Sequence, residues 1–565
     1  MDFSLGRRWA RENLPSVHPI ALCFIASAVL VTFYNDTLWH LALSSWQGRS
    51  AVDYLFLFSV GVALTVVFTI LMLIFSSARI VKYVLITLVL IAACASYFSA
   101  SYGVVFDKTM IQNVFETDVH EAGDFVTSGL IWHLVLFGLV PTCLIMALPL
   151  KTYSWQKEAY IRLATIGLCL ATLVVSGASF YQEYASFVRN NREMRYAINP
   201  TSPIYYMVRA LTPAPQGTNE EFHQVANLVE HKHRVGHRPT VLVFVLGETA
   251  RADRFSLNGY GRETNPRLAA LPIVNFTNAS SCGTSTAVSV PCLFSAQSQS
   301  DFTGDNAGST ENLLDVLVRA DFDVIWLENN SGCKGVCARV PAEVMSSVAS
   351  SSLCASGECR DEALVERLAE RLKTIEKDTV IVLHQMGSHG PAYYKRYPEA
   401  FRKFTPTCET TQLQLCSREE ISNAYDNTIL YTDNVLAEVI KTLGDASNHL
   451  DTSMLYVSDH GESLGEMGMY LHGMPYAISP AVQREVPLVF WSAPSFAQTS
   501  ALDLTCMEGE TARDLSHDNI FHSVLGLLRV KTDAYDASMD LFKPCAGTAP
   551  DNPVTASLPL SVRAE

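Results

Sequence analysis

The chain has 565 residues, whereas an ordinary domain has roughly 100–200, so we expect two or more folding units. Its 41 Lys and Arg against 56 Asp and Glu give a net charge of −15, which argues against nucleic-acid binding because that function needs a basic surface. A hydrophobic content of 49 % with only 17 % charged residues excludes a disordered chain and indicates membrane segments.

The first third of the chain contains five long apolar runs, each close to the ~20 residues with which a helix crosses a ~30 Å hydrocarbon layer. The first run follows several arginines, as a secretory signal does, but four further runs favour a retained anchor. We therefore predict a five-helix transmembrane domain over residues 1–181, with spans near 17–34, 54–76, 80–99, 125–150 and 160–181.

Basic residues around these runs predict the orientation of the chain. With a cytoplasmic N-terminus, the outside loops carry only Arg49 and Lys108, whereas the inside segments carry Arg7, Arg8, Arg11, Arg79, Lys82, Lys151, Lys157 and Arg162. This bias follows the positive-inside rule. Five crossings then place everything after Tyr181 outside the cytoplasm.

Ten cysteines follow the last apolar run, and such an even set is typical of disulfides in an oxidising compartment. A zinc knuckle formed by four of them, residues 333, 337, 354 and 359, is the alternative. The sequence does not fix the connectivity, but proximity groups them as Cys282/Cys292, Cys333/Cys337, Cys354/Cys359, Cys408/Cys416 and Cys506/Cys545.

Residues 182–238 form a polar bridge. Asn199-Pro200, Ser202-Pro203 and the Pro213–Gly217 stretch indicate turns in it. Aromatic and basic side chains are mixed at its start, which is typical of an interfacial helix lying on lipid headgroups. A plain connecting helix is the alternative. We predict a bridging interfacial helix followed by a linker.

Residues 239–565 have a different pattern, in which short β-branched and aromatic runs are separated by helix-compatible segments. This alternation indicates an α/β domain with a mostly parallel sheet, whose ligand site lies beyond the carboxyl ends of the strands. The predicted strands are 240–246, 323–327, 379–383, 454–457 and 486–491, and the predicted helices are 311–320, 361–375 and 419–443.

Candidate metal ligands follow three of these strands. Glu248 follows the first strand, Asp459 and His460 follow the fourth, and His389 comes shortly after the third. Two carboxylates, a neutral imidazole and an oxygen donor form a good tetrahedral zinc set. A solvated loop or helix cap is the alternative. His384 alternates with apolar strand residues, and we interpret it as structural.

A hydroxyl-rich loop over residues 280–287 is the candidate source of a nucleophile. A hydroxyl that opens a helix lies at the positive end of the helix, which favours an alkoxide and a bound phosphate. Metal ligation activates such a hydroxyl further. Thr284, Ser285 and Thr286 are rival candidates, and a simple turn with a helix N-cap is the alternative.

Four separated stretches carry a resemblance to a known family. They are Gly-Glu-Thr-Ala-Arg at 247–251, Cys-Gly-Thr-Ser-Thr-Ala at 282–287 with Pro-Cys at 291–292, Gly-Ser-His-Gly-Pro at 387–391, and Ser-Asp-His-Gly-Glu-Ser-Leu-Gly-Glu at 458–466 with Leu-His-Gly at 471–473. The chain resembles the bacterial lipid A phosphoethanolamine transferases, including the mobile colistin-resistance type, of the alkaline phosphatase and sulfatase superfamily. The resemblance implies that residues 239–565 are a periplasmic catalytic domain.

The resemblance also implies roles for the site residues. Thr286 would be the nucleophile, and a catalytic zinc ion would be held by Glu248, Thr286, Asp459 and His460. His389 and His472 would assist by binding the phosphate or a second zinc ion and by transferring protons, for which an imidazole with a pKa near 6.5 is suited.

Substrate contacts are implied for Lys334 and Asn330, at family positions that meet the phosphoethanolamine group. Asn113, Thr117 and Glu121 recur every four residues, so on a helix they share one face. The resemblance implies donor-lipid recognition there, with Glu121 meeting an ammonium group. The alternative is a solvated acidic helix face.

The function implied is transfer of phosphoethanolamine from phosphatidylethanolamine to a lipid A phosphate through a phosphoethanolamine-threonine intermediate. We expect a monomer in the bacterial inner membrane, with membrane lipids as its surroundings and no nucleic-acid partner. The added cation lowers the negative surface charge, so polymyxin and colistin resistance is the expected consequence.

Two other functions stay open at this stage. A related enzyme could transfer phosphoethanolamine or phosphoglycerol to core sugars or other envelope glycans. A non-catalytic receptor or transporter component is the third hypothesis, but transport predicts ionisable residues along the spans, and these runs contain few apart from His18 and His133.

Overall fold

The computed structural model describes residues 15–45, 51–117, 119–212, 222–231, 238–304, 308–348, 352–355 and 357–547. The chain forms two compact units, which are described separately. The first consists of Met1–Gly217 with Cys408–Ile421 and Ser463–Ser479. The second consists of Thr218–Thr407, Ser422–Glu462 and Pro480–Glu565.

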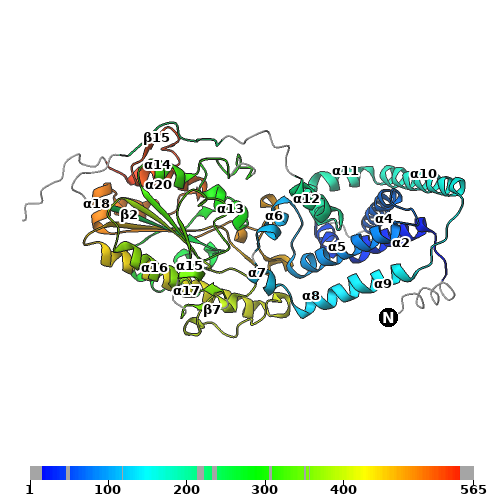
Figure 1. Ribbon diagram of the computed structural model, residues 1–565, viewed down its shortest axis with the longest axis horizontal. Coiled ribbons are helices and arrows are strands. Elements are labelled where there is room, and N and C mark those ends of the chain that lie inside the picture. Colours follow the sequence, from blue (N-terminus) through cyan, green and yellow to red (C-terminus); the bar gives the residue numbers. More distant parts are fainter. Residues whose placement is uncertain are drawn as a thin grey trace, which may run out of the picture. The chain divides into compact units, whose positions relative to one another are not determined.

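Apolar helices make up most of the first unit (Figure 1). Within the described residues, four helical stretches are long and apolar enough to cross a membrane, or five if a pair bent by 57° is one span. The structure therefore supports four to five apolar helices where the sequence predicts five spans. They are α4 (Ala51–Leu73), α5 (Val81–Tyr102), the run of α8 (Ser128–His133), η1 (Leu134–Leu139) and α9 (Val140–Ala147), α10 (Trp155–Ser179), and the bent pair α2 (Pro19–Phe33) and α3 (Asp36–Ser45).

The bend between α2 and α3 has a local cause in Asn35, which is buried. Its Nδ2 donates to the Leu30 carbonyl at 2.8 Å and to the Asn199 carbonyl at 2.8 Å. The Asn199 backbone N–H donates back to Asn35 Oδ1 at 2.7 Å. A side chain that bonds backbone groups in this way competes with the helix ladder and ends α2.

Shorter helices follow the spans in the part of the sequence predicted as a bridge. They include α11 (Tyr181–Asn190) and α12 (Thr201–Leu211), and α12 packs against α6 (Lys108–Glu116). Three apolar side chains of α12, Tyr205, Val208 and Leu211, are exposed at helical spacing. An exposed apolar strip of this kind suits a lipid interface, and that placement remains a proposal.

Two segments from late in the sequence are folded into the first unit. The hairpin of β11 (Ser463–Leu464) and β12 (Tyr470–Leu471) leads to Met474, which is buried. The Tyr102 hydroxyl also reaches the Thr411 carbonyl of the Cys408–Ile421 segment, at 3.5 Å. Met474 belongs to a cluster with Leu38, Ala42, Phe56, Leu57, Val105, Phe187, Met194 and Ala197.

A seven-stranded sheet in the order β3-β13-β10-β2-β9-β5-β6 organises the second unit. Its central strands are parallel, but β13 runs antiparallel to both of its neighbours, so the sheet is mixed. The expectation of a mostly parallel sheet is therefore met only from β10 to β6, and the sheet as a whole is mixed. The strands are β2 (Thr240–Gly247), β3 (Val274–Phe276), β5 (Asp323–Glu328), β6 (Ala342–Val344), β9 (Thr379–His384), β10 (Asp451–Ser458) and β13 (Leu488–Ser492).

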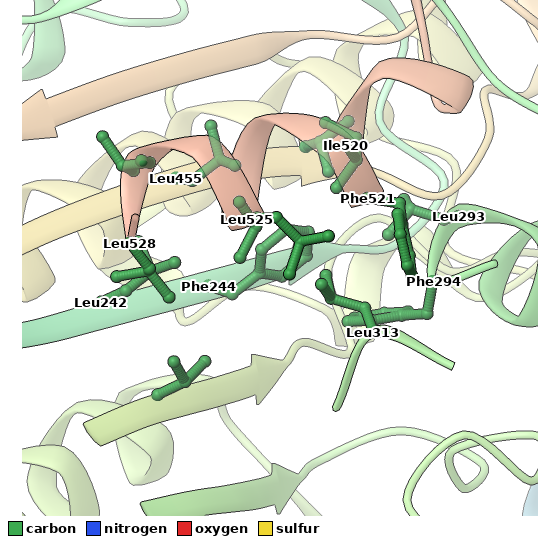
Figure 2. Close-up of a cluster of buried hydrophobic side chains, with 14 of the residues drawn as sticks. Leu242, Phe244, Leu293, Phe294, Leu313, Leu455, Ile520, Phe521, Leu525 and Leu528 are labelled. Carbon is green, nitrogen blue, oxygen red and sulfur yellow. The ribbon is translucent and has the colours of Figure 1, made fainter. Parts of the chain in front are cut away.

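Helices cover both faces of this sheet (Figure 1). One face carries α14 (Leu313–Arg319) and α20 (Asp518–Leu527), and the other carries α16 (Glu362–Leu372) and α17 (Arg418–Ala446). Figure 2 shows α20 lying over the strands and running along them, with its apolar side chains directed at residues of β2 and β10. Every residue of β9 and β10 is buried, so both faces of these strands are covered.

All five cysteine pairs grouped by proximity are disulfides in the structure. The alternative of a zinc knuckle is therefore wrong, since two of these bridges use its four cysteines. Cys23, Cys94, Cys143 and Cys169, which fall in the apolar runs, are free.

Candidate active site

Two neighbouring parallel strands deliver the candidate metal ligands. Ser458 at the end of β10 pairs in register with Gly247 at the end of β2. The next residue of each strand is a carboxylate, and the Asp459 backbone N–H donates to the Gly247 carbonyl at 2.9 Å. Glu248 and Asp459 therefore leave the sheet side by side at its carboxyl edge, as the strand pattern predicts.

Glu248, Asp459 and His460 form a group with the chemistry of a metal site. Their ligand atoms all lie within 4.8 Å of one another, and all three side chains are buried. His460 Nε2 lies 3.3 Å from Asp459 Oδ2 and 3.5 Å from Glu248 Oε1. These are the residue types that ligate Zn²⁺.

The charge of this group favours a cation. Burial, and then the nearby Glu248 carboxylate, raise the pKa of Asp459 well above its usual range. Asp459 Oδ1 accepts from the backbone N–H groups of Thr249 and His460, whereas Oδ2 faces the ligand group, 3.3 Å from His460 Nε2. A buried carboxylate oxygen facing a second carboxylate is costly without a positive charge, so the residues present fit a divalent ion.

Thr286 brings a hydroxyl to the same group. It is the first residue of α13 (Thr286–Leu293), after the N-cap Ser285. Its Oγ1 lies 3.2 Å from both carboxylate oxygens of Glu248 and 3.4 Å from His460 Nε2. The structure thus brings together the four residues that the sequence predicts as the zinc set.

The loop before α13 is held from several directions. The Cys282–Cys292 disulfide ties the loop to its own helix, and the Gly283 N–H donates to Ser289 Oγ at 2.9 Å. His517 joins the loop to the sheet, because its Nδ1 accepts from the Cys282 N–H at 3.1 Å while Nε2 contacts the Ser458 carbonyl at 2.9 Å. Nothing in the sequence marks His517 for this position.

Because His517 is buried, we expect the folded protein to lose stability in acid. Burial lowers its pKa from 6.5 to about 4. Below pH 6.5 the unfolded chain takes up a proton here that the native chain does not, so the free energy of unfolding falls as the pH drops from 6.5 to about 4, by roughly 2–4 kcal/mol. We expect the melting temperature of the full chain in detergent to fall over that range.

His517→Gln provides the comparison, since the amide can accept from Cys282 and donate to Ser458 without titrating. We expect this variant to flatten the slope between pH 6.5 and 4. His449→Gln, at an exposed histidine, is the control and should keep the slope of the wild type. An unchanged slope in His517→Gln would contradict the assignment.

Gly387 lies so close to Glu248 that a side chain cannot fit. Its φ is +53°, and a Cβ at this position would come within 2.6 Å of the Glu248 carbonyl oxygen. We expect Gly387→Ala to displace Glu248, destabilise the chain by about 1–3 kcal/mol and lower zinc affinity and transferase activity at least tenfold.

Gly444→Ala is the matched control, because Gly444 lies in α17 and a Cβ added there would have no neighbouring atom within 4 Å. It should leave zinc affinity and activity unchanged and raise the melting temperature slightly, since alanine favours the helix. Equal behaviour of the two variants in isothermal titration with Zn²⁺ would show that Gly387 has no special role.

The remaining predicted site residues fall in both units. In the second unit, Asn330 Nδ2 donates to Glu248 Oε2 at 2.7 Å, and Lys334 Nζ donates to the carbonyl and hydroxyl oxygens of Ser331, both at 3.1 Å. His389 is buried in the same unit. His472 belongs to the first unit.

One expectation for the first unit is wrong. Asn113 and Thr117 do not continue along one helix to Glu121, because α6 ends at Glu116 and α7 (Val119–Asp124) is a separate helix. Thr117 is extended, and its hydroxyl donates to the Asn113 carbonyl at 2.7 Å, which caps α6. The side chain of Glu121 lies outside the described part of the chain.

In the first unit, the structure places the predicted residue Asn113 near the loop that carries the predicted residue His472. A Cβ on Gly473 would lie 3.3 Å from Asn113 Nδ2, so the loop that carries His472 lies beside α6. This neighbourhood joins residues that are far apart in the sequence, and no local pattern in the chain signals it.

Two family models match parts of this chain. Residues 240–530 match the family described as Sulfatase, and the strand-end ligand group with its helix-opening hydroxyl defines the class as the alkaline phosphatase and sulfatase superfamily. Residues 64–214 match a second family, described as Phosphoethanolamine transferase EptA/EptB.

Individual relatives extend over nearly the whole chain. Phosphoethanolamine transferase EptA of Salmonella typhimurium is 36 % identical over 92 % of this chain and 95 % of its own, and phosphatidylethanolamine transferase Mcr-1 of Escherichia coli is 40 % identical over 93 % and 97 %. The structure of lipooligosaccharide phosphoethanolamine transferase A from Neisseria meningitidis, an integral membrane protein, matches with a TM-score of 0.90 at 36 % identity, covering 95 % of this chain and 100 % of that one. The chain belongs to the phosphoethanolamine transferase family of the EptA and Mcr type.

Proposed function

We propose that this enzyme transfers phosphoethanolamine from phosphatidylethanolamine to a phosphate of lipid A, with Thr286 as the nucleophile. The single observation that carries the proposal is the position of Thr286 Oγ1, 3.2 Å from the Glu248 carboxylate and 3.4 Å from His460 Nε2 at the start of a helix. The positive end of the helix favours a developing alkoxide and the phosphate bound to it.

Glu248, Asp459 and His460 would hold one zinc ion together with the Thr286 oxygen. When bound, the ion lowers the pKa of the hydroxyl and neutralises charge on the phosphate. The buried carboxylates support this assignment, because their mutual repulsion is relieved by a cation. Metal analysis of the purified protein would count the zinc ions and decide whether a second one binds near His389.

The chemistry proceeds in two displacement steps. Thr286 Oγ attacks the phosphorus of phosphatidylethanolamine, the bond to the glycerol oxygen breaks, and diacylglycerol leaves with a proton. The product is phosphoethanolamine esterified to Thr286. A lipid A phosphate oxygen then attacks the same phosphorus, the bond to Thr286 breaks, and the hydroxyl regains its proton.

Further side chains, some in each unit, serve binding and proton transfer in this proposal. His389 and His472 carry protons to and from the leaving and attacking oxygens, which suits an imidazole near neutral pH. Lys334 supplies a positive charge to the phosphate. Asn113 and Thr117 of the first unit, with Glu121, contact the donor headgroup.

The membrane helices support the choice of lipid substrates. Anchored beside a bilayer, the enzyme meets donor and acceptor headgroups at high local concentration. We propose an inner-membrane location with the second unit in the periplasm, which the five disulfides of this sequence support. Adding an ethanolamine cation lowers the attraction of the surface for cationic peptides such as polymyxin and colistin.

Purified full-length protein in detergent with fluorescent phosphatidylethanolamine tests the proposal. We expect release of fluorescent diacylglycerol and, without an acceptor, a phosphoethanolamine mass increment on the intact protein. Lipid A should discharge the adduct, whereas core oligosaccharide and other envelope glycans should not. No diacylglycerol and no adduct would overturn the proposal in favour of a binding protein, and discharge by core sugars alone would overturn the acceptor.

A further inference from the structure

A buried carboxylate and a buried imidazole form a pair behind Glu248. Glu328 ends β5 and His384 ends β9, and the two residues pair directly in the parallel register. His384 Nδ1 lies 3.0 Å from Glu328 Oε2, and both side chains are buried. The Trp326 indole N–H donates to the same carboxylate oxygen at 2.7 Å. His384, which the sequence predicts to be structural, is therefore buried and also contacts a buried carboxylate.

Asn330 connects this pair to the metal-ligand group. Its backbone N–H donates to Glu328 Oε1 at 2.6 Å, and its Oδ1 accepts from the Ser331 N–H at 2.7 Å. The second contact fixes the orientation of the amide, so Nδ2 faces Glu248 and donates to Oε2 at 2.7 Å. Asn330 is thus held on one side by Glu328 and holds Glu248 on the other.

The tautomer of His384 follows from the same contacts. A carboxylate only accepts hydrogen bonds, so Glu328 holds the proton on Nδ1 and leaves Nε2 as an acceptor. Nε2 lies 3.4 Å from Asn330 Nδ2, on the side that donates. Burial works to raise the pKa of Glu328, but the hydrogen bonds from His384, Trp326 and Asn330 bring it below its usual value.

We propose that Glu328 and His384 are positioning residues that act through Asn330 to aim the Glu248 carboxylate at the metal ion and at Thr286. This inference rests on the proposed function, because it takes Glu248 to be a zinc ligand. Partners that orient a metal ligand from behind typically change metal affinity or activity 10–100-fold when removed. Asn330 accordingly acts on the ligand Glu248, in addition to the substrate contact expected of it.

We call the action of Glu328 and His384 on Glu248 through Asn330 the relay. Zinc affinity of the full-length protein in detergent micelles tests it. Glu328→Gln keeps the shape of the side chain, but its NH₂ group must face either the Asn330 N–H or the donors of Trp326 and His384. We expect the Kd for Zn²⁺, measured by competition with a chromophoric chelator, to rise about 10–100-fold. Asn330→Ala should raise the Kd to a similar extent.

The double variant separates a relay from two independent effects. Because Glu328 acts through Asn330, the double variant Glu328→Gln/Asn330→Ala should bind Zn²⁺ no more weakly than Asn330→Ala alone. Changes that multiply would overturn the relay. Should Glu328→Gln fail to fold, Asn330→Ala still decides, since an unchanged Kd in that variant contradicts the proposal.

Glu311→Gln is the matched control. Glu311 is an equally buried carboxylate of the same unit, which pairs with Arg319 at 2.6 Å and accepts from the backbone of Val225 and Ala226. It should lower the melting temperature and leave the Kd for Zn²⁺ unchanged. An equal loss of zinc affinity in this control would refute a specific relay.

Different results refute the proposed function and the relay. Wild-type protein that forms no phosphoethanolamine adduct refutes the function, whereas wild type that forms the adduct beside a Glu328→Gln variant of normal zinc affinity refutes only the relay.

Discussion

Replacing Thr286 with alanine is expected to abolish the phosphoethanolamine adduct and to reduce diacylglycerol release by on the order of a thousandfold or more, as loss of a covalent nucleophile does elsewhere. The reason is geometric, since Oγ1 of Thr286 is placed against both Glu248 and His460. Intact-mass spectrometry after incubation with phosphatidylethanolamine and a fluorescent diacylglycerol assay measure the two effects.

Two further variants make this result specific. Thr286→Ser keeps a hydroxyl at the same place and should retain an adduct. Ser285→Ala removes the neighbouring hydroxyl, which is buried, and should leave the adduct in place. An adduct that persists in Thr286→Ala and disappears in Ser285→Ala would move the nucleophile from Thr286 to Ser285.

Replacing Asp459 with asparagine is expected to change stability in opposite directions with and without metal. In metal-free protein the native pKa of Asp459 is raised by burial and by Glu248, so ionising it at pH 7 costs stability that grows as the pH rises above the unfolded value. Asparagine removes that cost, and we expect the metal-free variant to be more stable than metal-free wild type by about 1 kcal/mol or more.

With Zn²⁺ bound, we expect the wild type to be more stable than the Asp459→Asn variant. A ligand that binds only the native state raises stability by mass action, so Zn²⁺ should raise the melting temperature of the wild type. The variant lacks one charged ligand and should show little response and negligible transfer. Thermal unfolding of full-length protein in a chelator and in Zn²⁺ measures both effects. A variant that responds to Zn²⁺ like the wild type would remove Asp459 from the metal site.

The central strands could be predicted from the sequence because their cause is local. Runs such as those of β2, β9 and β10 are buried on both faces, and turn residues mark their ends. β3 and β6 have three residues each, too few for a pattern, and the direction of β13 depends on its neighbours. The mixed character of the sheet therefore appears only in the structure.

The candidate site divides in the same way. Glu248, Asp459 and His460 directly follow strands, so the rule for strand ends finds them without coordinates. The rule does not find the residues that hold these ligands in place. Glu328 meets His384 across 56 positions, and His517 meets Cys282 across 235. Such pairs are products of the sheet order, and nothing in the sequence around either member marks the other.

Local reasoning is sufficient for the cysteines and insufficient for the loop before the fourth span. The disulfides link near neighbours, except Cys506–Cys545, which is the pair that remains after the others are grouped. A spacing of four residues predicts one helical face for Asn113, Thr117 and Glu121, but α6 ends at Glu116, Thr117 is extended, and α7 is a separate helix.

The way the chain is shared between its two units limits how the enzyme can be taken apart. The backbone passes from one unit to the other at five places, after Gly217, Thr407, Ile421, Glu462 and Ser479. A fragment cut at the first of these places keeps the ligand group but carries Met469, Met474 and His472 without the helices that surround the methionines. A fragment that begins after Gly217 is therefore better suited to studies of zinc binding than to studies of any step that depends on His472.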